Sequence, residues 1–260
     1  MITSLQKRIE KSRVSKVAHH RIDQIVRSRK PLIFDHLPKC GGSTVNNYVK
    51  AVYTSKYTFA IKGSAKSQSI RTFQSWPRQK RHSMKLVYGH NANQLFDDVN
   101  PDAIRATVIR EPVDRIVSHY YYVMRNKQHP LHKIVTENEI PLSEYCSHGL
   151  SDELENWYVS HFSGLRRVDV NRSPQNAVNK AVNNLFETYD VIGFQDDIAS
   201  FINQVRSVVG IGKPYRGKKM NVTNQRKPLA EIEKDVIHKI QEKNQLDIQF
   251  YQRIREIIHS

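Results

Sequence analysis

The segment at residues 38–44, Pro-Lys-Cys-Gly-Gly-Ser-Thr, combines residue types that bind phosphate groups. It follows an apolar run, and its two glycines would let backbone N–H groups approach an anion closely. Ser43 and Thr44 can start a helix, whose N-terminus adds unpaired donors and a partial positive charge. Lys39 adds a mobile cation. We interpret the segment as a phosphate-binding loop; the alternative is a tight strand-to-helix turn that binds nothing.

The order of these residues differs from that of a nucleoside-triphosphate P-loop. In such a loop the lysine follows the last glycine and directly precedes Ser or Thr. Here Lys39 precedes both glycines. The pattern therefore disfavours an ordinary NTPase.

A second segment could hold another phosphate group. Arg110 ends an apolar run, and Pro112 favours the start of a helix directly after it. Ser118 lies on that helix, so its hydroxyl and the Arg110 guanidinium could reach the same phosphate, the guanidinium in bidentate fashion. The alternative is that Arg110 pairs with Asp114 or Glu111 at the surface while Ser118 faces solvent.

Among 12 histidines, His90 is placed best for catalysis, because it lies just beyond a short apolar run at 86–88. An unperturbed histidine pKa of roughly 6.5 suits a general base. The alternative is a hydrogen-bonded loop histidine. We expect structural or indirect roles for His36 and His119. No group of His, Cys, Asp and Glu has metal-ligand spacing, so we expect no metal.

Short apolar runs alternate with amphipathic segments along the chain, and this pattern predicts an α/β fold. We expect a P-loop-like three-layer fold with a mostly parallel central sheet flanked by helices and with ligand beyond the carboxyl ends of the strands. The expected strands are 32–37, 57–61, 86–88, 103–109 and 191–194. The expected helices are 43–53, 112–126, 152–162, 174–188 and 196–208, with one or two more between 228 and 258. We expect a loop or irregular helix at 63–85 and a mobile basic loop at 210–228.

Length and composition fit one large domain. The 260 residues are 38% hydrophobic and 25% charged, which is typical of globular proteins. We expect a basic helical arm at 1–30 and a single domain at 31–260. The charged start of the chain and the lack of a long apolar stretch argue against a signal peptide or membrane span. Two cysteines favour a reducing compartment, the cytoplasm; the alternative is a Golgi-lumen domain cut from its anchor.

The excess of 41 Lys and Arg over 25 Asp and Glu gives a formal charge of +16. Nucleic acid, anionic lipid, a polyanionic substrate and a phosphate-rich cofactor would all be attracted by such a charge. Composition alone does not distinguish among these four kinds of partner.

Taken together, residues 37–44 and 108–121 resemble the 5′-phosphosulfate loop and the 3′-phosphate motif of sulfotransferases that use 3′-phosphoadenylyl sulfate. The resemblance is closest to the carbohydrate branch that includes the heparan sulfate 2-O- and 6-O-sulfotransferases. It extends in order over residues 31–255, with residues 88–90 similar to the catalytic-histidine segment and 244–251 to a C-terminal helix. One departure is Tyr88, which stands where the 2-O-sulfotransferases carry a second histidine.

The resemblance implies specific roles. Lys39 would stabilise the leaving oxygen, His90 would be the base, and the basic loop around 213–227 would close over the nucleotide. The residues implied to bind the donor are Lys39, Cys40, Gly41, Gly42, Ser43, Thr44, Arg110, Ser118, Thr223 and Arg226. The co-substrate would be 3′-phosphoadenylyl sulfate, the product adenosine 3′,5′-bisphosphate, and no metal would be needed.

The expected acceptor is a carbohydrate hydroxyl, on an anionic polysaccharide or glycan, with no nucleic acid partner and no integral membrane contact. Two alternatives stay open: a basic nucleic-acid-binding protein and an atypical nucleotide kinase. The sequence does not indicate an oligomeric state.

Overall fold

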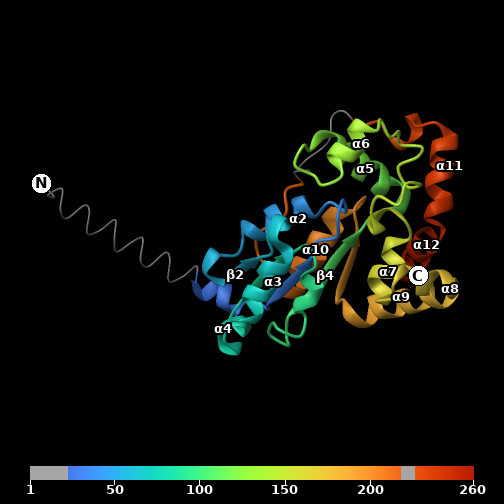
Figure 1. The fold of residues 1–260 in the computed structure, drawn as a ribbon. Helices are drawn as coiled ribbons and strands as arrows, with labels where there is room; N and C mark the ends of the chain where they lie inside the picture. Colours follow the sequence, from blue (N-terminus) through green and yellow to red (C-terminus); the bar gives the residue numbers. More distant parts are fainter. Residues whose placement is uncertain (1–22, 218–225) are drawn as a thin grey trace, which may run out of the picture. The chain divides into compact units, whose positions relative to one another are not determined.

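A computed structural model describes residues 23–217 and 226–260 (Figure 1). The described residues form two compact units. The first unit contains residues 23–36, 43–107 and 199–217, and the second contains 37–42, 108–198 and 226–260. Most of the expected basic arm at 1–30 lies outside the described residues, and 23–28 are helical. A single domain over 31–260 stays a prediction.

The strands form one parallel sheet in the order β2-β3-β1-β4-β5. Leu32 of β1 pairs with Leu86 of β3 on one side and with Ile104 of β4 on the other. The strands are β1 (Leu32–Asp35), β2 (Thr58–Ala60), β3 (Leu86–Gly89), β4 (Ile104–Ile109) and β5 (Val191–Phe194). The central strands are apolar and buried, as a sheet covered on both faces requires. The predicted α/β fold with a parallel sheet is confirmed.

The first unit contains helices in a segment where we expected none that were regular. Residues 63–85 hold α3 (Lys66–Gln74) and α4 (Arg78–His82), separated at Pro77. The segment is therefore more regular than the loop or irregular helix that we expected. Phe73 supplies the reason, because it is fully buried and its ring centre lies 4.7 Å from that of Phe59. Ile70 is buried as well, so two apolar residues of α3 anchor a helix whose other residues are polar. The remaining helices that contribute to this unit are α2 (Gly42–Lys50) and α10 (Ile198–Val209).

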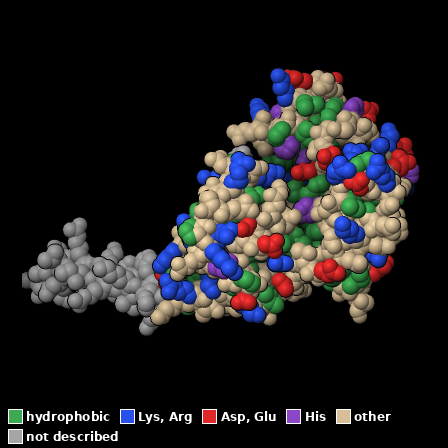
Figure 2. Space-filling model, turned by 60° about the horizontal axis from the view of Figure 1, so that its bottom comes forward, with side chains coloured by type: hydrophobic (Ala, Val, Ile, Leu, Met, Phe, Trp, Pro, Cys, Tyr) green, Lys and Arg blue, Asp and Glu red, His purple; other side chains and the backbone are tan. Residues whose placement is uncertain are grey.

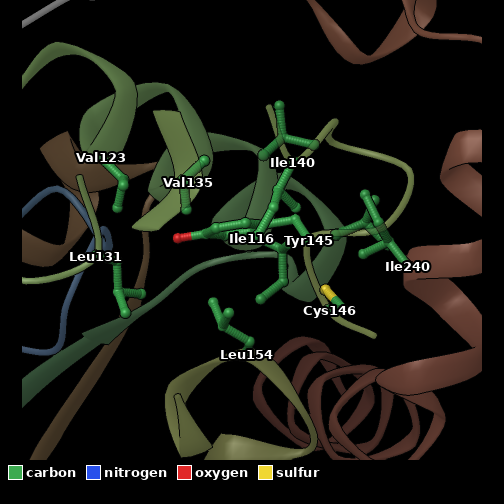
Figure 3. Close-up of a cluster of buried hydrophobic side chains, with 11 residues drawn as sticks. Ile116, Val123, Leu131, Val135, Ile140, Tyr145, Cys146, Leu154 and Ile240 are labelled. Atoms are coloured by element: carbon green, nitrogen blue, oxygen red, sulfur yellow. The ribbon is translucent and has the colours of Figure 1, made fainter. Parts of the chain in front are cut away.

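The second unit is mostly helical. Its core includes a cluster in which α5 packs against residues of α6, α11 and the segment between α6 and α7 (Figure 3). Tyr145 is fully buried at its centre, with Ile116 and Leu154 around it. The helices are α5 (Pro112–Arg125), α6 (His132–Glu137), α7 (Trp157–Ser163), α8 (Arg167–Arg172), α9 (Pro174–Thr188), α11 (Lys234–Lys243) and α12 (Gln245–His259).

The start of α5 follows from its sequence. Pro112 occupies the first turn, where its missing N–H costs nothing. Glu111 caps the helix, and its carboxylate accepts hydrogen bonds from the backbone N–H groups of Val113 and Asp114 at 3.1 and 2.6 Å. Arg110 is thereby held between the end of β4 and the start of α5.

Candidate active site

The loop Leu37–Gly42 after β1 has the backbone of a tight turn. Lys39 has φ of 63° and Gly41 has φ of 81°, both in the left-handed region. A Cβ atom on Gly41 would lie 2.9 Å from Ile198 Cδ1, so this position requires glycine for space as well as for conformation. Gly42 begins α2, which carries no acidic residue in its first turn. The loop therefore meets the requirements of an anion cradle.

The side chain of Lys39 lies over an aromatic ring. Its Nζ is 3.9 Å from the centre of the Tyr122 ring, a cation–π distance. Burial, together with the smaller effect of the positive charges of Arg110 and Arg125, lowers the pKa of Lys39 to about 8. Lys39 is therefore mostly protonated at neutral pH, which suits a group that stabilises a developing negative charge.

Arg110 contacts the phosphate-binding loop directly. Its Nη1 donates to the carbonyl oxygen of Lys39 at 2.9 Å, and its Nε donates to Asp114 Oδ2 at 2.5 Å. The Arg110 side chain is only 11% exposed, and burial lowers its pKa. The expected alternative, a pair with Asp114, is thus present, but the guanidinium is buried and joined to the loop rather than lying at the surface.

A second arginine shares the carboxylate of Asp114. Arg226 Nη2 donates to Asp114 Oδ1, so one carboxylate holds two guanidinium groups. Burial lowers the pKa of Arg226 to about 10, and the nearby charge of Arg110 contributes. Among the described residues, the buried Nε of Arg226 has no hydrogen-bond acceptor. Two arginines, one with an unused donor, fit a phosphate group.

Two further residues were expected around the 3′-phosphate, and the structure describes one of them. Ser118 lies on α5 and is half-buried. Thr223 lies outside the described residues.

His90 belongs to the first unit and follows β3. Its Nδ1 lies 2.6 Å from the carbonyl oxygen of His36. A carbonyl oxygen only accepts, so Nδ1 carries the proton and Nε2 is the basic nitrogen of the ring. The two imidazole rings also stack, with centres 4.3 Å apart. This tautomer is the one that a base acting through Nε2 requires.

The supports of His90 are themselves held in place. His36 Nδ1 lies 3.2 Å from Asn46 Nδ2 on α2, and the amide must be the donor. A Cβ on Gly89 would lie 2.8 Å from the Ile61 carbonyl oxygen, so the turn before His90 requires glycine. Gly89 has φ of 138° and Asn91 has φ of 62°, so a residue with positive φ lies on each side of His90.

The expected site residues divide between the two units. The first unit contains Ser43, Thr44 and His90, and the second contains Lys39, Cys40, Gly41, Gly42, Arg110, Ser118 and Arg226. Within the second unit, Arg110 is hydrogen-bonded to the loop. Within the first unit, His90 is hydrogen-bonded to His36.

The sequence named one partner of these residues in advance, since Asp114, four residues after Arg110, was the alternative expected for that arginine. The other partners were missed. Tyr122 and Asn46 carried no signal, since each is one polar or aromatic residue on an amphipathic helix. His119 is buried, and its Nδ1 lies 2.8 Å from the Tyr145 hydroxyl. Burial lowers the pKa of His119 to about 3, which fits the structural role expected of it.

Two features are absent from the described residues. No cluster of three or more His, Cys, Asp or Glu within 23–217 and 226–260 could hold a metal ion. In the same ranges, no helix has the length and apolar character needed to cross a membrane.

A parallel sheet with a glycine-containing loop after one strand and buried arginines after another is typical of α/β proteins that bind anionic nucleotides. The chain belongs to the sulfotransferase family, whose family model matches residues 23–252. A solved structure that it resembles is a sulfotransferase from Alicyclobacillus acidocaldarius, with 12% identity and a TM-score of 0.48 over 86% of this chain and 95% of that one. No curated protein sequence matches the chain.

Proposed function

We propose that this sulfotransferase moves a sulfuryl group from 3′-phosphoadenylyl sulfate to a hydroxyl of a carbohydrate. The observation that carries the proposal is the position of Arg110, which binds the loop through the Lys39 carbonyl and shares Asp114 with Arg226. A donor with a 5′-phosphosulfate and a 3′-phosphate needs cations at two separate points. Lys39 and the arginine pair supply them.

The donor is assigned to two sets of residues. Backbone N–H groups of the loop and the start of α2 would bind the 5′-phosphosulfate, because oriented amides bind anions without adding mobile charge. The first set is Lys39, Cys40, Gly41, Gly42, Ser43 and Thr44. The second set, for the 3′-phosphate, is Arg110, Ser118, Thr223 and Arg226.

The reaction resembles phosphoryl transfer, so positioning and electrostatics dominate it. The acceptor oxygen forms a bond to sulfur while the bond between sulfur and the bridging phosphate oxygen breaks. His90 Nε2 takes the proton of the acceptor hydroxyl, and its bond to the His36 carbonyl keeps Nδ1 protonated. Negative charge develops on the bridging oxygen, and the Lys39 ammonium stabilises it there. The product is adenosine 3′,5′-bisphosphate, and no step requires a metal.

An anionic acceptor is supported by the charge of +16, since donor binding accounts for only a few of these cations. Lys and Arg side chains are spread over the face drawn in Figure 2, among Asp and Glu. Two cations near α4 are engaged within the protein, since Arg81 pairs with Asp98 and Lys85 Nζ donates to the Arg29 carbonyl. Arg78 and Lys80 are exposed, and Lys80 Nζ lies 3.6 Å from the centre of the Trp76 ring. An exposed cation beside an aromatic ring could bind a sugar that carries a negative charge.

Calorimetry with three ligands tests the donor. Adenosine 3′,5′-bisphosphate should bind tightly without magnesium, while ATP with magnesium and a short DNA duplex should bind weakly or not at all. Tight binding of the duplex would instead favour a nucleic-acid-binding protein, and tight binding of ATP with magnesium an atypical kinase. Family membership favours neither alternative.

An acceptor screen with a labelled sulfate donor tests the second half of the proposal. Uronate-containing or sulfated glycans should be better acceptors than neutral ones, and added salt should reduce the difference. Equal use of neutral and anionic acceptors without salt dependence would contradict an acidic acceptor. We further propose a reducing compartment, the cytoplasm, which is consistent with the free thiols of Cys40 and Cys146.

A further inference from the structure

Tyr158, on α7, is a fully buried tyrosine whose hydroxyl meets both donor-binding segments of the second unit. Its Oη lies 3.1 Å from Cys40 Sγ in the loop after β1. The same oxygen lies 3.1 Å from the backbone nitrogen of Arg110 and 3.0 Å from the carbonyl oxygen of Arg110. One hydroxyl therefore joins the loop to the residue that directly follows β4.

The hydrogen-bonding capacity of this hydroxyl is fully used. A tyrosine hydroxyl has one proton and two lone pairs. The proton goes to the Arg110 carbonyl, and one lone pair accepts the Arg110 N–H. The thiol of Cys40 can then donate to the remaining lone pair at 3.1 Å, and its other acceptor, the Pro38 carbonyl oxygen, lies farther away at 3.4 Å. Burial raises the pKa of both Cys40 and Tyr158, so each stays protonated at neutral pH, as this arrangement requires.

Tyr158 is held both at its backbone and at its ring. The Asp247 carboxylate, from α12, accepts hydrogen bonds from the backbone N–H groups of Tyr158 and Val159, both at 3.0 Å, and so caps the start of α7. The guanidinium of Arg115 lies 5.0 Å from the Tyr158 ring centre. Arg115 is itself completely buried and donates to the Glu153 carbonyl at 2.7 Å. The hydroxyl has little room to move.

We propose that Tyr158 is a positioning residue for donor binding, which holds the phosphate-binding loop and Arg110 in one fixed geometry. Arg110 reaches the loop in two ways: its side chain binds the Lys39 carbonyl, and its backbone is joined to Cys40 through Tyr158. Because the loop backbone would bind one phosphate and the Arg110 side chain another, a shift between them would misplace both. This inference rests on the proposed function.

The test compares Tyr158→Phe with Tyr145→Phe. Tyr145 is an equally buried tyrosine of the same unit, and its hydroxyl bonds to His119 instead of the donor-binding segments. Both variants lose a buried hydroxyl bond, so both should have a lower melting temperature. Only Tyr158→Phe should bind adenosine 3′,5′-bisphosphate about tenfold more weakly, the effect of losing a positioning hydrogen bond. Equal affinity of the two variants would overturn the proposal.

Cys40 offers a second pair of variants if Tyr158→Phe does not fold. Cys40→Ser keeps a donor for the Tyr158 hydroxyl, whereas Cys40→Ala removes it, and both keep the backbone N–H that would bind phosphate. The alanine variant should bind adenosine 3′,5′-bisphosphate several-fold more weakly than the serine variant. Equal affinities would show that the side-chain contact does not position the loop.

Alkylation of Cys40 by iodoacetamide, followed by mass spectrometry, gives a readout that does not depend on the donor. Labelling of Cys40 should be faster in Tyr158→Phe than in the unmodified protein and unchanged in Tyr145→Phe. Unchanged labelling in both would contradict the proposed contact. If the unmodified protein binds no adenosine 3′,5′-bisphosphate, the proposed function fails, while the labelling comparison still tests the role of Tyr158 in holding the loop.

Discussion

The ammonium group of Lys39 rests on the ring of Tyr122, 3.9 Å from its centre. This contact favours the charged form of Lys39, while burial and the charges of Arg110 and Arg125 favour the neutral form and bring the pKa to about 8. The pKa of this lysine, for which we propose a catalytic role, is therefore close enough to neutral pH that a modest change of its surroundings would alter its charge.

The first prediction concerns the alkaline limb of the pH profile. A reaction that needs the Lys39 ammonium should lose kcat/KM for the donor as the pH rises through about 8, because the free enzyme then loses that proton. Lys39→Arg, which stays charged, should lack this limb. Tyr122→Leu should move the limb to lower pH, and Tyr122→Phe, which keeps the ring, should not. If the unmodified protein and the three variants all show the same alkaline limb, the limb does not arise from Lys39.

The second prediction concerns Arg110 and the 3′-phosphate. Arg110→Ala should weaken adenosine 3′,5′-bisphosphate binding by about 100-fold, the typical effect of removing one partner of a buried charged contact. Binding of 5′-AMP, which lacks the 3′-phosphate, should change little. Arg255→Ala is the control, since it removes a surface pair with Asp196 in the same unit. An equal loss for both nucleotides in calorimetry would mean that Arg110 acts on the loop instead.

The third prediction separates catalysis from binding at His90. His90→Ala should lower turnover by roughly 100-fold or more, as expected for loss of a general base, and should leave adenosine 3′,5′-bisphosphate binding intact. His132→Ala is a matched control, because its Nδ1 also lies close to a backbone carbonyl, that of Val123 at 2.8 Å. If binding and turnover fell together in His90→Ala, His90 would be structural.

The fourth prediction uses two glycines with the same backbone angle. Gly41 has φ of 81° and Gly210 has φ of 82°, but only Gly41 has atoms within contact distance of an added Cβ. Gly41→Ala and Gly210→Ala should each lose about 1 kcal/mol of stability from the left-handed conformation. Gly41→Ala should lose more, through contact with Ile198, and should also bind adenosine 3′,5′-bisphosphate more weakly. Thermal unfolding and calorimetry measure both effects, and equal behaviour of the two variants would show that the loop adjusts.

Much of the fold follows from local patterns. The bounds of β5 and α9 agree with those expected, because Pro174 marks the start of the helix and a short apolar run marks the strand. The helix expected at 152–162 begins only at Trp157, since 152–154 form a separate short turn. The segment at 66–82 was expected to be a loop or irregular helix, because most of its residues are polar or charged and its helices bury only two apolar side chains, Ile70 and Phe73.

The contacts of the candidate site were harder to predict than its residues. Lys39, Arg110 and His90 could be named because each follows an apolar strand. The bond from Tyr158 to Cys40 joins residues 118 positions apart, and no periodic pattern reveals such a contact. The shared carboxylate of Asp114 likewise depends on where Arg226 folds back, which its own neighbours in the sequence do not determine.

The capping of α5 by Glu111 limits how nucleotide preference could change. Its carboxylate already occupies the first amides of α5, so a phosphate bound beside Arg110 has to be recognised by side chains. The loop after β1, by contrast, offers backbone amides that every residue type except proline retains. In the proposed donor site, recognition by backbone amides at the 5′ end therefore depends less on side chains, apart from Lys39 and the glycine required at position 41, whereas single substitutions at the 3′ end can alter specificity. Evolutionary change of the donor would begin at the arginines.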